Sequence, residues 1–160
     1  MANRSFLELR LGLLGLLLLV FSCQEESPDP TCSPYTPPIY PDQYDFPLRP
    51  GMPEWAALQT GEDMYKVTQL PDSVLQEISS EGLLETCLDY PLLYNVFAYT
   101  SLQFGFTRVL SRFNGFEELG SRPDASPLLL NRYQEMDVTC FQNMSEVEQG
   151  GYTFTFTFVE

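Results

Sequence analysis

Carboxylates are the side chains of this sequence whose spacing could support catalysis. Two carboxyl groups about 5–10 Å apart, on either side of a sugar bond, can hydrolyse a glycoside. Glu81 and Glu85 are one helical turn apart and are expected to share one face of a helix. The acidic residues form four close pairs, namely Glu62 and Asp63, Glu81 and Glu85, Glu117 and Glu118, and Glu135 and Asp137. A solvated helix surface explains each pair more simply, so a carboxylate-based glycan hydrolase remains an alternative.

Histidine is absent from the sequence, and this excludes several kinds of catalysis. Ser-His-Asp and Cys-His mechanisms need an imidazole, and so do the usual histidine-bearing zinc sites. Lys66 is the only lysine, and it does not belong to the Ser-x-x-Lys motif of a serine–lysine acyl enzyme. The sequence also has neither a phosphate-binding glycine loop nor an EF-hand loop. We therefore expect no enzymatic activity, no cofactor and no metal site.

The cysteines of the expected folded region allow two interpretations. Cys87 and Cys140 could form a disulfide in an oxidising compartment. The alternative for Cys87 is a buried thiol that packs as a small apolar side chain on a helix face. Cys32 falls in a proline-rich segment and is expected to be exposed.

The N-terminus has a short charged head, an apolar run from Leu11 to Phe21, and then Ser22 and Cys23. The run is too short to cross a bilayer core of about 30 Å as a helix. With an aliphatic Val20, a small Ser22 and then Cys23, the segment resembles the signal peptide of bacterial lipoproteins. The resemblance implies cleavage after Ser22 and acylation of Cys23. The alternative is an ordinary secretory signal that leaves Cys23 as a plain cysteine.

Three residues behind the expected lipidation site, Gln24, Glu25 and Glu26, resemble the surface-export tag of Bacteroidota-type lipoproteins. The two resemblances together imply a protein of the cell envelope that is lipid-anchored on the outer membrane, and the second resemblance implies exposure at the cell surface. Acyl chains contribute about 0.8 kcal/mol per buried CH₂, so several chains on one cysteine would attach the protein firmly.

The charge of the chain limits its partners. Without its first 22 residues, which carry Arg4, Glu8 and Arg10, the chain has 21 acidic against six basic side chains and a net charge of −15. Nucleic-acid affinity rests on Lys and Arg that neutralise phosphates, so no nucleic-acid partner is expected. An acidic surface suits a basic protein target. An acidic inhibitor or immunity-type protein is therefore one alternative function.

Four segments are expected along the chain: a signal peptide (1–22), a proline-rich tether (23–53), a helical domain (54–137), and a linker with a terminal β-strand (138–160). Nine of the thirteen prolines fall between residues 24 and 53, and this density favours extended chain. From residue 54 onward, apolar residues recur at helical spacing, most clearly at Phe106, Val109, Leu110 and Phe113. About six short helices in an irregular bundle or short stack are expected.

The last residues follow a different pattern. Residues 152–158 alternate aromatic residues with threonine after the pair Gly150 and Gly151. Strict alternation predicts a β-strand. Such a strand needs a neighbour, which could be residues 138–141, another protein, or residues beyond the end of the sequence. The expected fold class is therefore mainly α with an isolated C-terminal strand.

The leading functional expectation combines the anchor, the tether and the lack of catalytic motifs. We expect a membrane-anchored interaction module that binds a protein or a glycan. The acidic inhibitor and the carboxylate hydrolase are the alternatives.

Overall fold

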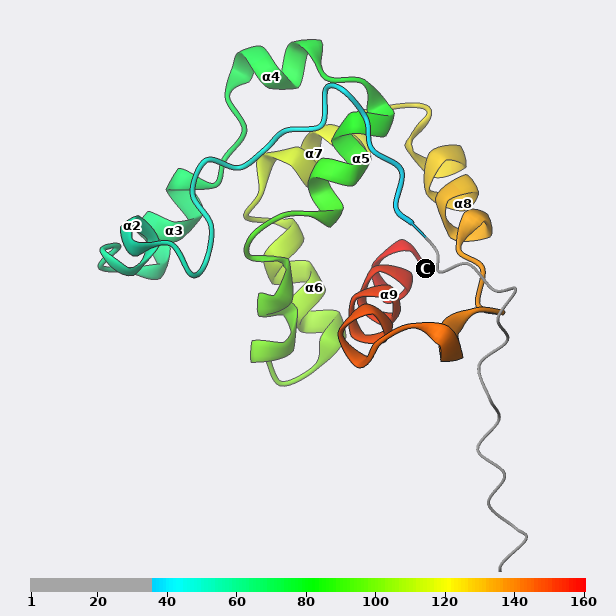
Figure 1. Cartoon of the computed structure of the whole chain (residues 1–160). Helices are drawn as coiled ribbons and strands as arrows, with labels where there is room; N and C mark the ends of the chain where they lie inside the picture. Colours follow the sequence, from blue (N-terminus) through cyan, green and yellow to red (C-terminus); the bar gives the residue numbers. More distant parts are fainter. Residues whose placement is uncertain (1–35) are drawn as a thin grey trace, which may run out of the picture. The chain divides into compact units, whose positions relative to one another are not determined.

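Short helices make up most of the chain in this computed structural model, which describes residues 36–160 (Figure 1). The expected signal peptide, the expected lipidation site Cys23 and the expected tether up to residue 35 lie outside the described residues. Eight α-helices and two 3-10 helices are present among residues 36–160, so the expectation of a mainly helical fold is confirmed. Over the same residues, none of the helices combines the length and apolar character that a membrane span requires.

The helices follow one another with few residues between them. In chain order they are α2 (Pro53–Ala56), α3 (Gly61–Val67), α4 (Asp72–Glu77), α5 (Ser80–Leu88), the 3-10 helix η1 (Leu93–Ala98), α6 (Leu102–Leu110), α7 (Asn114–Ser121), α8 (Ala125–Glu135), the 3-10 helix η2 (Phe141–Asn143) and α9 (Glu146–Val159).

Serine side chains begin three of the longer helices. The hydroxyls of Ser79, Ser101 and Ser145 accept hydrogen bonds from backbone N–H groups in the first turns of α5, α6 and α9. Each bond satisfies a donor that the helix itself cannot pair. These caps set where each helix starts.

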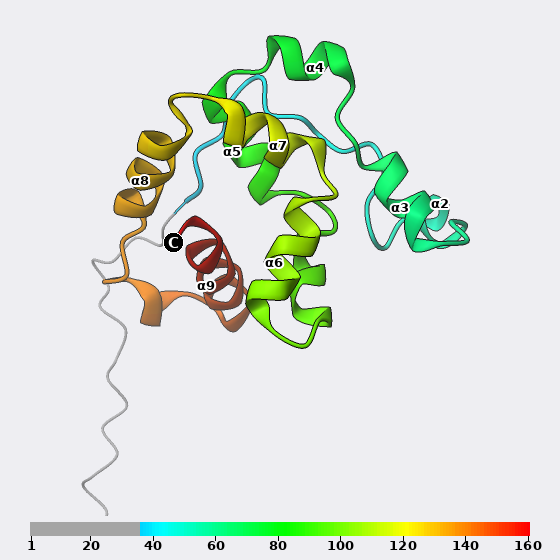
Figure 2. The same ribbon diagram turned by 180° about the vertical axis from the view of Figure 1, so that it is seen from behind.

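Helix α5 forms the centre of the domain. Residues 82–87 are all buried, and α5 packs against both α7 and α8 (Figures 1 and 2). Beside it, the rings of Tyr90 and Phe113 stack with their centroids 4.1 Å apart, and Phe46 contacts both rings. The main core is therefore aromatic on one side and aliphatic along α5.

The described part of the expected tether packs against the helices. Phe46 is only 2% exposed and belongs to the main core. The backbone N–H of Tyr44 donates to the hydroxyl of Thr86, and Arg49 bonds Asp89 at 2.6 Å. Residues 44–49 are thus bound to the helical domain despite Pro47.

The predicted C-terminal strand is wrong, because residues 152–158 lie within helix α9. Positions two apart on a helix point in directions about 200° apart, and positions four apart share a face. The alternating aromatics therefore separate into two pairs on different sides of α9, Tyr152 with Phe156 and Phe154 with Phe158.

Each aromatic pair of α9 meets a different neighbour. The ring of Phe156 packs on Tyr133 of α8 at 4.8 Å, whereas Phe158 packs on Phe106 of α6 at 4.6 Å. Figures 1 and 2 show α9 between α8 and α6. The aromatic residues of α9 pack on two sides because the helix lies between α8 and α6, and a strand is not needed to explain their spacing.

Candidate functional site

An aromatic groove of about 640 Å³ lies where α9 passes η1. Its volume falls within the range of small-ligand sites, about 300–1,000 Å³. The apolar wall is built from residues of η1, α6, η2 and α9, namely Tyr94, Phe97, Leu102, Phe141 and Phe154. We call this site the α9 groove.

Two exposed rings form the platform of the α9 groove. Tyr94 is 60% exposed and Phe97 is 55% exposed, which is unusual for aromatic side chains. The buried Phe154 supports both of them. Its ring stacks nearly parallel on Tyr94 with a centroid distance of 3.7 Å, and it lies 5.7 Å from Phe97. The platform is therefore held in place from below while much of its surface stays open to solvent.

The rest of the groove lining is a polar stripe on α9. Glu146, Gln149, Thr153 and Thr157 line the groove and recur at spacings of three and four residues, so they share one helix face. Gly150 lies within this stripe, and nothing approaches the position that a Cβ atom would take there. The stripe offers carboxylate, amide and hydroxyl groups at the edge of an aromatic surface.

Close packing under the platform positions it. Helix α6 contacts η1 closely, because a Cβ atom on Gly105 would come within 2.1 Å of the Val96 carbonyl oxygen. Only glycine permits this approach of two backbones. Val96 and Leu93, which alternate with the exposed rings along η1, are buried in the main core. The turn geometry of η1 thus points Tyr94 and Phe97 outward.

The predicted carboxylate pairs serve mostly as structural groups. Glu117 and Glu62 line other cavities of the domain, and none of the eight residues lines the α9 groove. One member of every pair is bound within the fold: Asp63 caps α3 through Thr60, Glu85 pairs with Arg132, Glu118 pairs with Arg122, and Asp137 accepts from Thr139.

Glu85 is the one member of these pairs that is fully buried. Its carboxylate accepts a hydrogen bond from Nε of Arg132 at 2.5 Å. Burial and the nearby carboxylate of Glu135 raise the pKa of Glu85 to about 7, and burial lowers the pKa of Arg132. The expectation that Glu81 and Glu85 share a solvated surface therefore fails for Glu85.

The structure distinguishes the two interpretations of the cysteines. Cys87 is a free thiol, fully buried on α5, and burial raises the pKa of that thiol. The buried-thiol alternative is thus confirmed. Cys140 is disulfide-bonded, and Cys87 is not its partner.

Metal-binding side chains do not gather in the described part of the chain. Residues 36–160 contain no group of three or more His, Cys, Asp or Glu side chains placed to hold a metal ion. No protein-family model, curated protein or solved structure matches the chain.

Sequence reasoning missed the α9 groove. Tyr94 and Phe154 are 60 residues apart, and the aromatic residues of α9 are explained equally well by a strand. The helix spacing of Glu146, Gln149, Thr153 and Thr157 was the one local signal of a shared polar face.

Proposed function

We propose that this chain is an exported, lipid-anchored binding module of the cell envelope whose α9 groove binds a neutral glycan. The resemblance of residues 1–26 to a lipoprotein signal supports export and anchoring at Cys23. The observation that carries the choice of ligand is that the exposed rings of Tyr94 and Phe97 and the polar stripe of α9 line the same groove.

A sugar ring has the two kinds of surface that this groove offers. Its C–H bonds pack against the electron-rich face of an aromatic ring, as on Tyr94. Its hydroxyls exchange hydrogen bonds with groups such as the carboxylate of Glu146 and the hydroxyl of Thr153. A bound glycan would therefore contact the aromatic platform and the polar stripe at once, whereas a purely apolar ligand leaves the polar stripe without partners.

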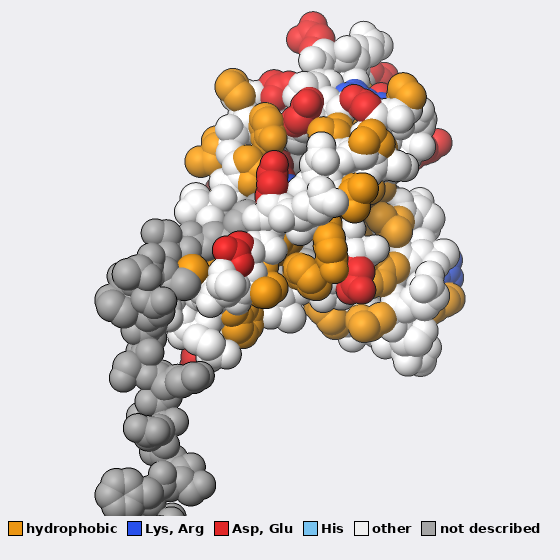
Figure 3. All heavy atoms as spheres, turned by 90° about the vertical axis from the view of Figure 1, so that its right-hand side faces the viewer, with side chains coloured by type: hydrophobic (Ala, Val, Ile, Leu, Met, Phe, Trp, Pro, Cys, Tyr) orange, Lys and Arg blue, Asp and Glu red, His pale blue; other side chains and the backbone are white. Residues whose placement is uncertain are grey.

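The charge of the chain supports a neutral ligand rather than an anionic one. The full sequence has a net charge of −14, and the α9 groove contains Glu146 but no Lys or Arg. Lys and Arg side chains are also sparse on the face shown in Figure 3, where hydrophobic and acidic side chains are both common. A polyanionic glycan would be repelled by this field.

The test is binding of neutral envelope oligosaccharides to the wild-type chain and to two variants. Tyr94→Ala removes one of the two rings of the platform and is expected to weaken binding about tenfold or more, which corresponds to about 1.4 kcal/mol. Phe104→Ala is the matched control. Phe104, on α6, is an exposed aromatic residue like Tyr94, but it does not line the groove. Equal affinities of wild type and Tyr94→Ala would contradict the proposal.

An acidic inhibitor or immunity-type protein is the second candidate, and the distribution of charge favours it. Three of the six arginines and lysines behind the expected cleavage site are held in short ion pairs, namely Arg49, Arg122 and Arg132. Their positive charge is locally neutralised, so acidic groups dominate the remaining surface. This function predicts tight binding to one basic target that weakens as salt is raised. Affinity that does not change with salt would remove its basis.

A further inference from the structure

Arg112 lies in the turn between α6 and α7 and borders two adjoining cavities. One is a cleft of about 940 Å³ between α6, α7 and α8, and the other is a pocket of about 420 Å³ beside α3. Arg112 and Gln69 line both cavities, whereas neither residue lines the α9 groove. This region is therefore separate from the proposed glycan site.

Positive charge is concentrated around Arg112 although the chain is strongly acidic. Lys66 lines the smaller pocket with Arg112, and Arg108 lies one helical turn before Arg112. All three side chains are exposed, and only Arg112 makes an ion pair within the described residues. The other three cations of residues 36–160 are those already held in short ion pairs.

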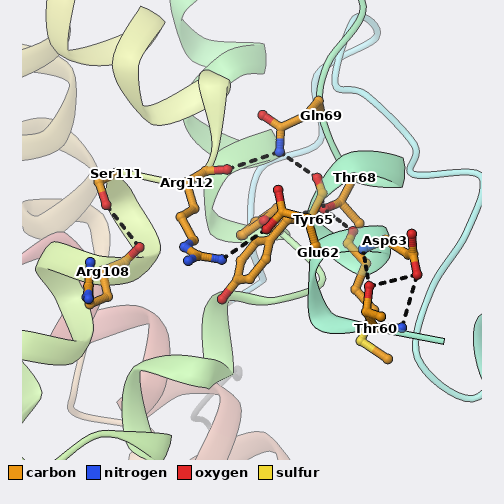
Figure 4. Close-up of polar contacts among 11 residues, drawn as sticks. Thr60, Glu62, Asp63, Tyr65, Thr68, Gln69, Arg108, Ser111 and Arg112 are labelled. Carbon is orange, nitrogen blue, oxygen red and sulfur yellow. Dashed lines mark hydrogen bonds and ion pairs between the residues drawn. The ribbon is translucent and has the colours of Figure 1, made fainter. Parts of the chain in front are cut away.

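The backbone and the side chain of Arg112 are both oriented by α3 and the loop that follows it (Figure 4). Its carbonyl oxygen accepts a hydrogen bond from Nε2 of Gln69 at 3.0 Å. Its guanidinium lies over the ring of Tyr65, 4.6 Å from the ring centroid. A guanidinium stacked on an aromatic ring keeps the N–H donors at its edge available for a planar acceptor.

The present partner of Arg112 is weakly held. Nη1 of Arg112 lies 3.6 Å from Oε2 of Glu62, and the two side chains are 43% and 83% exposed. Exposed ion pairs of this kind contribute about 0–1 kcal/mol, so a competing carboxylate can replace Glu62 at little cost.

We propose that the cavity bordered by Arg112 and Lys66 binds the carboxylate of a small ligand, which displaces Glu62. A carboxylate matches the two parallel donors of one guanidinium. Leu110, Phe116 and Leu129 line the larger cleft and would contact the apolar or C–H part of the same ligand. Arg112 and Lys66 together favour a single negative charge over a doubly charged phosphate, because Glu117 also lines the larger cleft and Arg122 there is already paired with Glu118.

Four probes distinguish the sources of such a carboxylate. Galacturonate and its neutral counterpart galactose represent sugars, while N-acetyl-leucine and its amide represent amino-acid carboxylates. Binding is measured by calorimetry on the full chain purified in detergent. Binding of at least one carboxylate probe, with no binding of its neutral counterpart, is the expected result. Failure of both carboxylates to bind at millimolar concentration overturns the proposal.

Three variants then assign the site. Arg112→Ala is expected to weaken the carboxylate probe about tenfold or more, because a charge-assisted pair of hydrogen bonds is lost. Glu62→Gln is expected to strengthen it about two- to fivefold, since the competing ion pair is gone. Arg108→Ala is the control for the loss of a nearby positive charge, because Arg108 lines neither cavity, and it is expected to weaken binding much less than Arg112→Ala.

The outcomes separate this proposal from the glycan site. Loss of carboxylate binding in Arg112→Ala together with a gain in Glu62→Gln supports it, and the gain does not depend on how well Arg112→Ala folds. Unchanged affinity in both variants overturns it. Tyr94→Ala is expected to leave carboxylate binding intact, so failure at the α9 groove and failure at Arg112 can be told apart.

Discussion

Nε of Arg132 in α8 lies 2.5 Å from Oε1 of Glu85 in α5, and the two side chains are only 4% and 7% exposed. A buried ion pair is costly to form, because both charges lose their hydration. Once formed, it is also costly to break from one side. The pair therefore joins α5 to α8, and replacing either partner alone is expected to destabilise the domain.

Replacing Arg132 by Met is expected to destabilise the domain by about 3 kcal/mol at pH 8, where Glu85 is ionised and would be left without its cation. Arg49→Met is the matched control, because it breaks the exposed pair with Asp89 and is expected to cost about 1 kcal/mol or less. Urea unfolding of the two variants measures both values. Similar losses of unfolding free energy in the two variants would show that the buried pair contributes no more to stability than the exposed one.

The stability of the domain is expected to depend on pH through Glu85. Its pKa is about 7 in the folded chain against 4.5 for the free side chain, so the unfolded state loses this proton first as pH rises. The protonated Glu85 therefore contributes to the free energy of unfolding fully below pH 4.5, and this contribution is lost as pH rises through 7. The shift corresponds to about 3 kcal/mol.

Glu85→Gln is expected to remove this pH dependence, since glutamine does not titrate. The measurement is the free energy of unfolding of both proteins between pH 4 and 8. Because other carboxyls contribute as well, the difference between the two proteins is the quantity to compare. A wild-type stability that rises relative to Glu85→Gln between pH 4.5 and 7 would mean that Arg132 keeps Glu85 ionised throughout.

The sequence predicted helices where the apolar stripe was local and failed where a contact was distant. Val109 and Phe113 of the stripe are buried as expected, although the helix ends at Leu110. The alternating residues of α9 fit a strand and a helix that packs against neighbours on two sides equally well. Only the neighbours on both sides, far away in sequence, make the helix the better solution.

Two glycine substitutions with opposite expected signs test the helical state of α9 and the close contact of α6 with η1. Gly151 lies in the interior of α9, and nothing occupies the place of a Cβ atom there. Gly151→Ala is therefore expected to stabilise the domain by about 0.5–1 kcal/mol and to raise its helicity. Gly105→Ala is expected to destabilise it, because the new Cβ would collide with the carbonyl of Val96. Thermal unfolding followed by circular dichroism gives both results, and a destabilising Gly151→Ala would contradict a continuous helix.

The candidate sites were harder to predict than the helices, because each depends on contacts between distant segments: ring contacts at the α9 groove and polar contacts around Arg112. The side-chain amide of Asn114 accepts from the backbone N–H of Leu70 and donates to its carbonyl oxygen. The backbone N–H of Asn114 donates to the side-chain oxygen of Gln69. These bonds place Arg112 beside α3. The bonded residues are separated by 44 and 45 positions in the sequence. The asparagine and glutamine that make these bonds do not follow a periodic pattern, so the sequence alone does not predict them.

Acylation of Cys23 is the expectation on which the cellular role depends. Replacing Cys23 by Ala removes the thiol that would carry the acyl chains, so the protein is expected to move from the membrane fraction to the soluble fraction or to accumulate uncleaved. Cys87→Ala is the control, since Cys87 is a buried thiol of the core and has no access to the membrane. Fractionation followed by mass spectrometry of the N-terminus checks both variants. A wild-type chain whose N-terminus carries no fatty acid would contradict the anchor while leaving the α9 groove to be tested on its own.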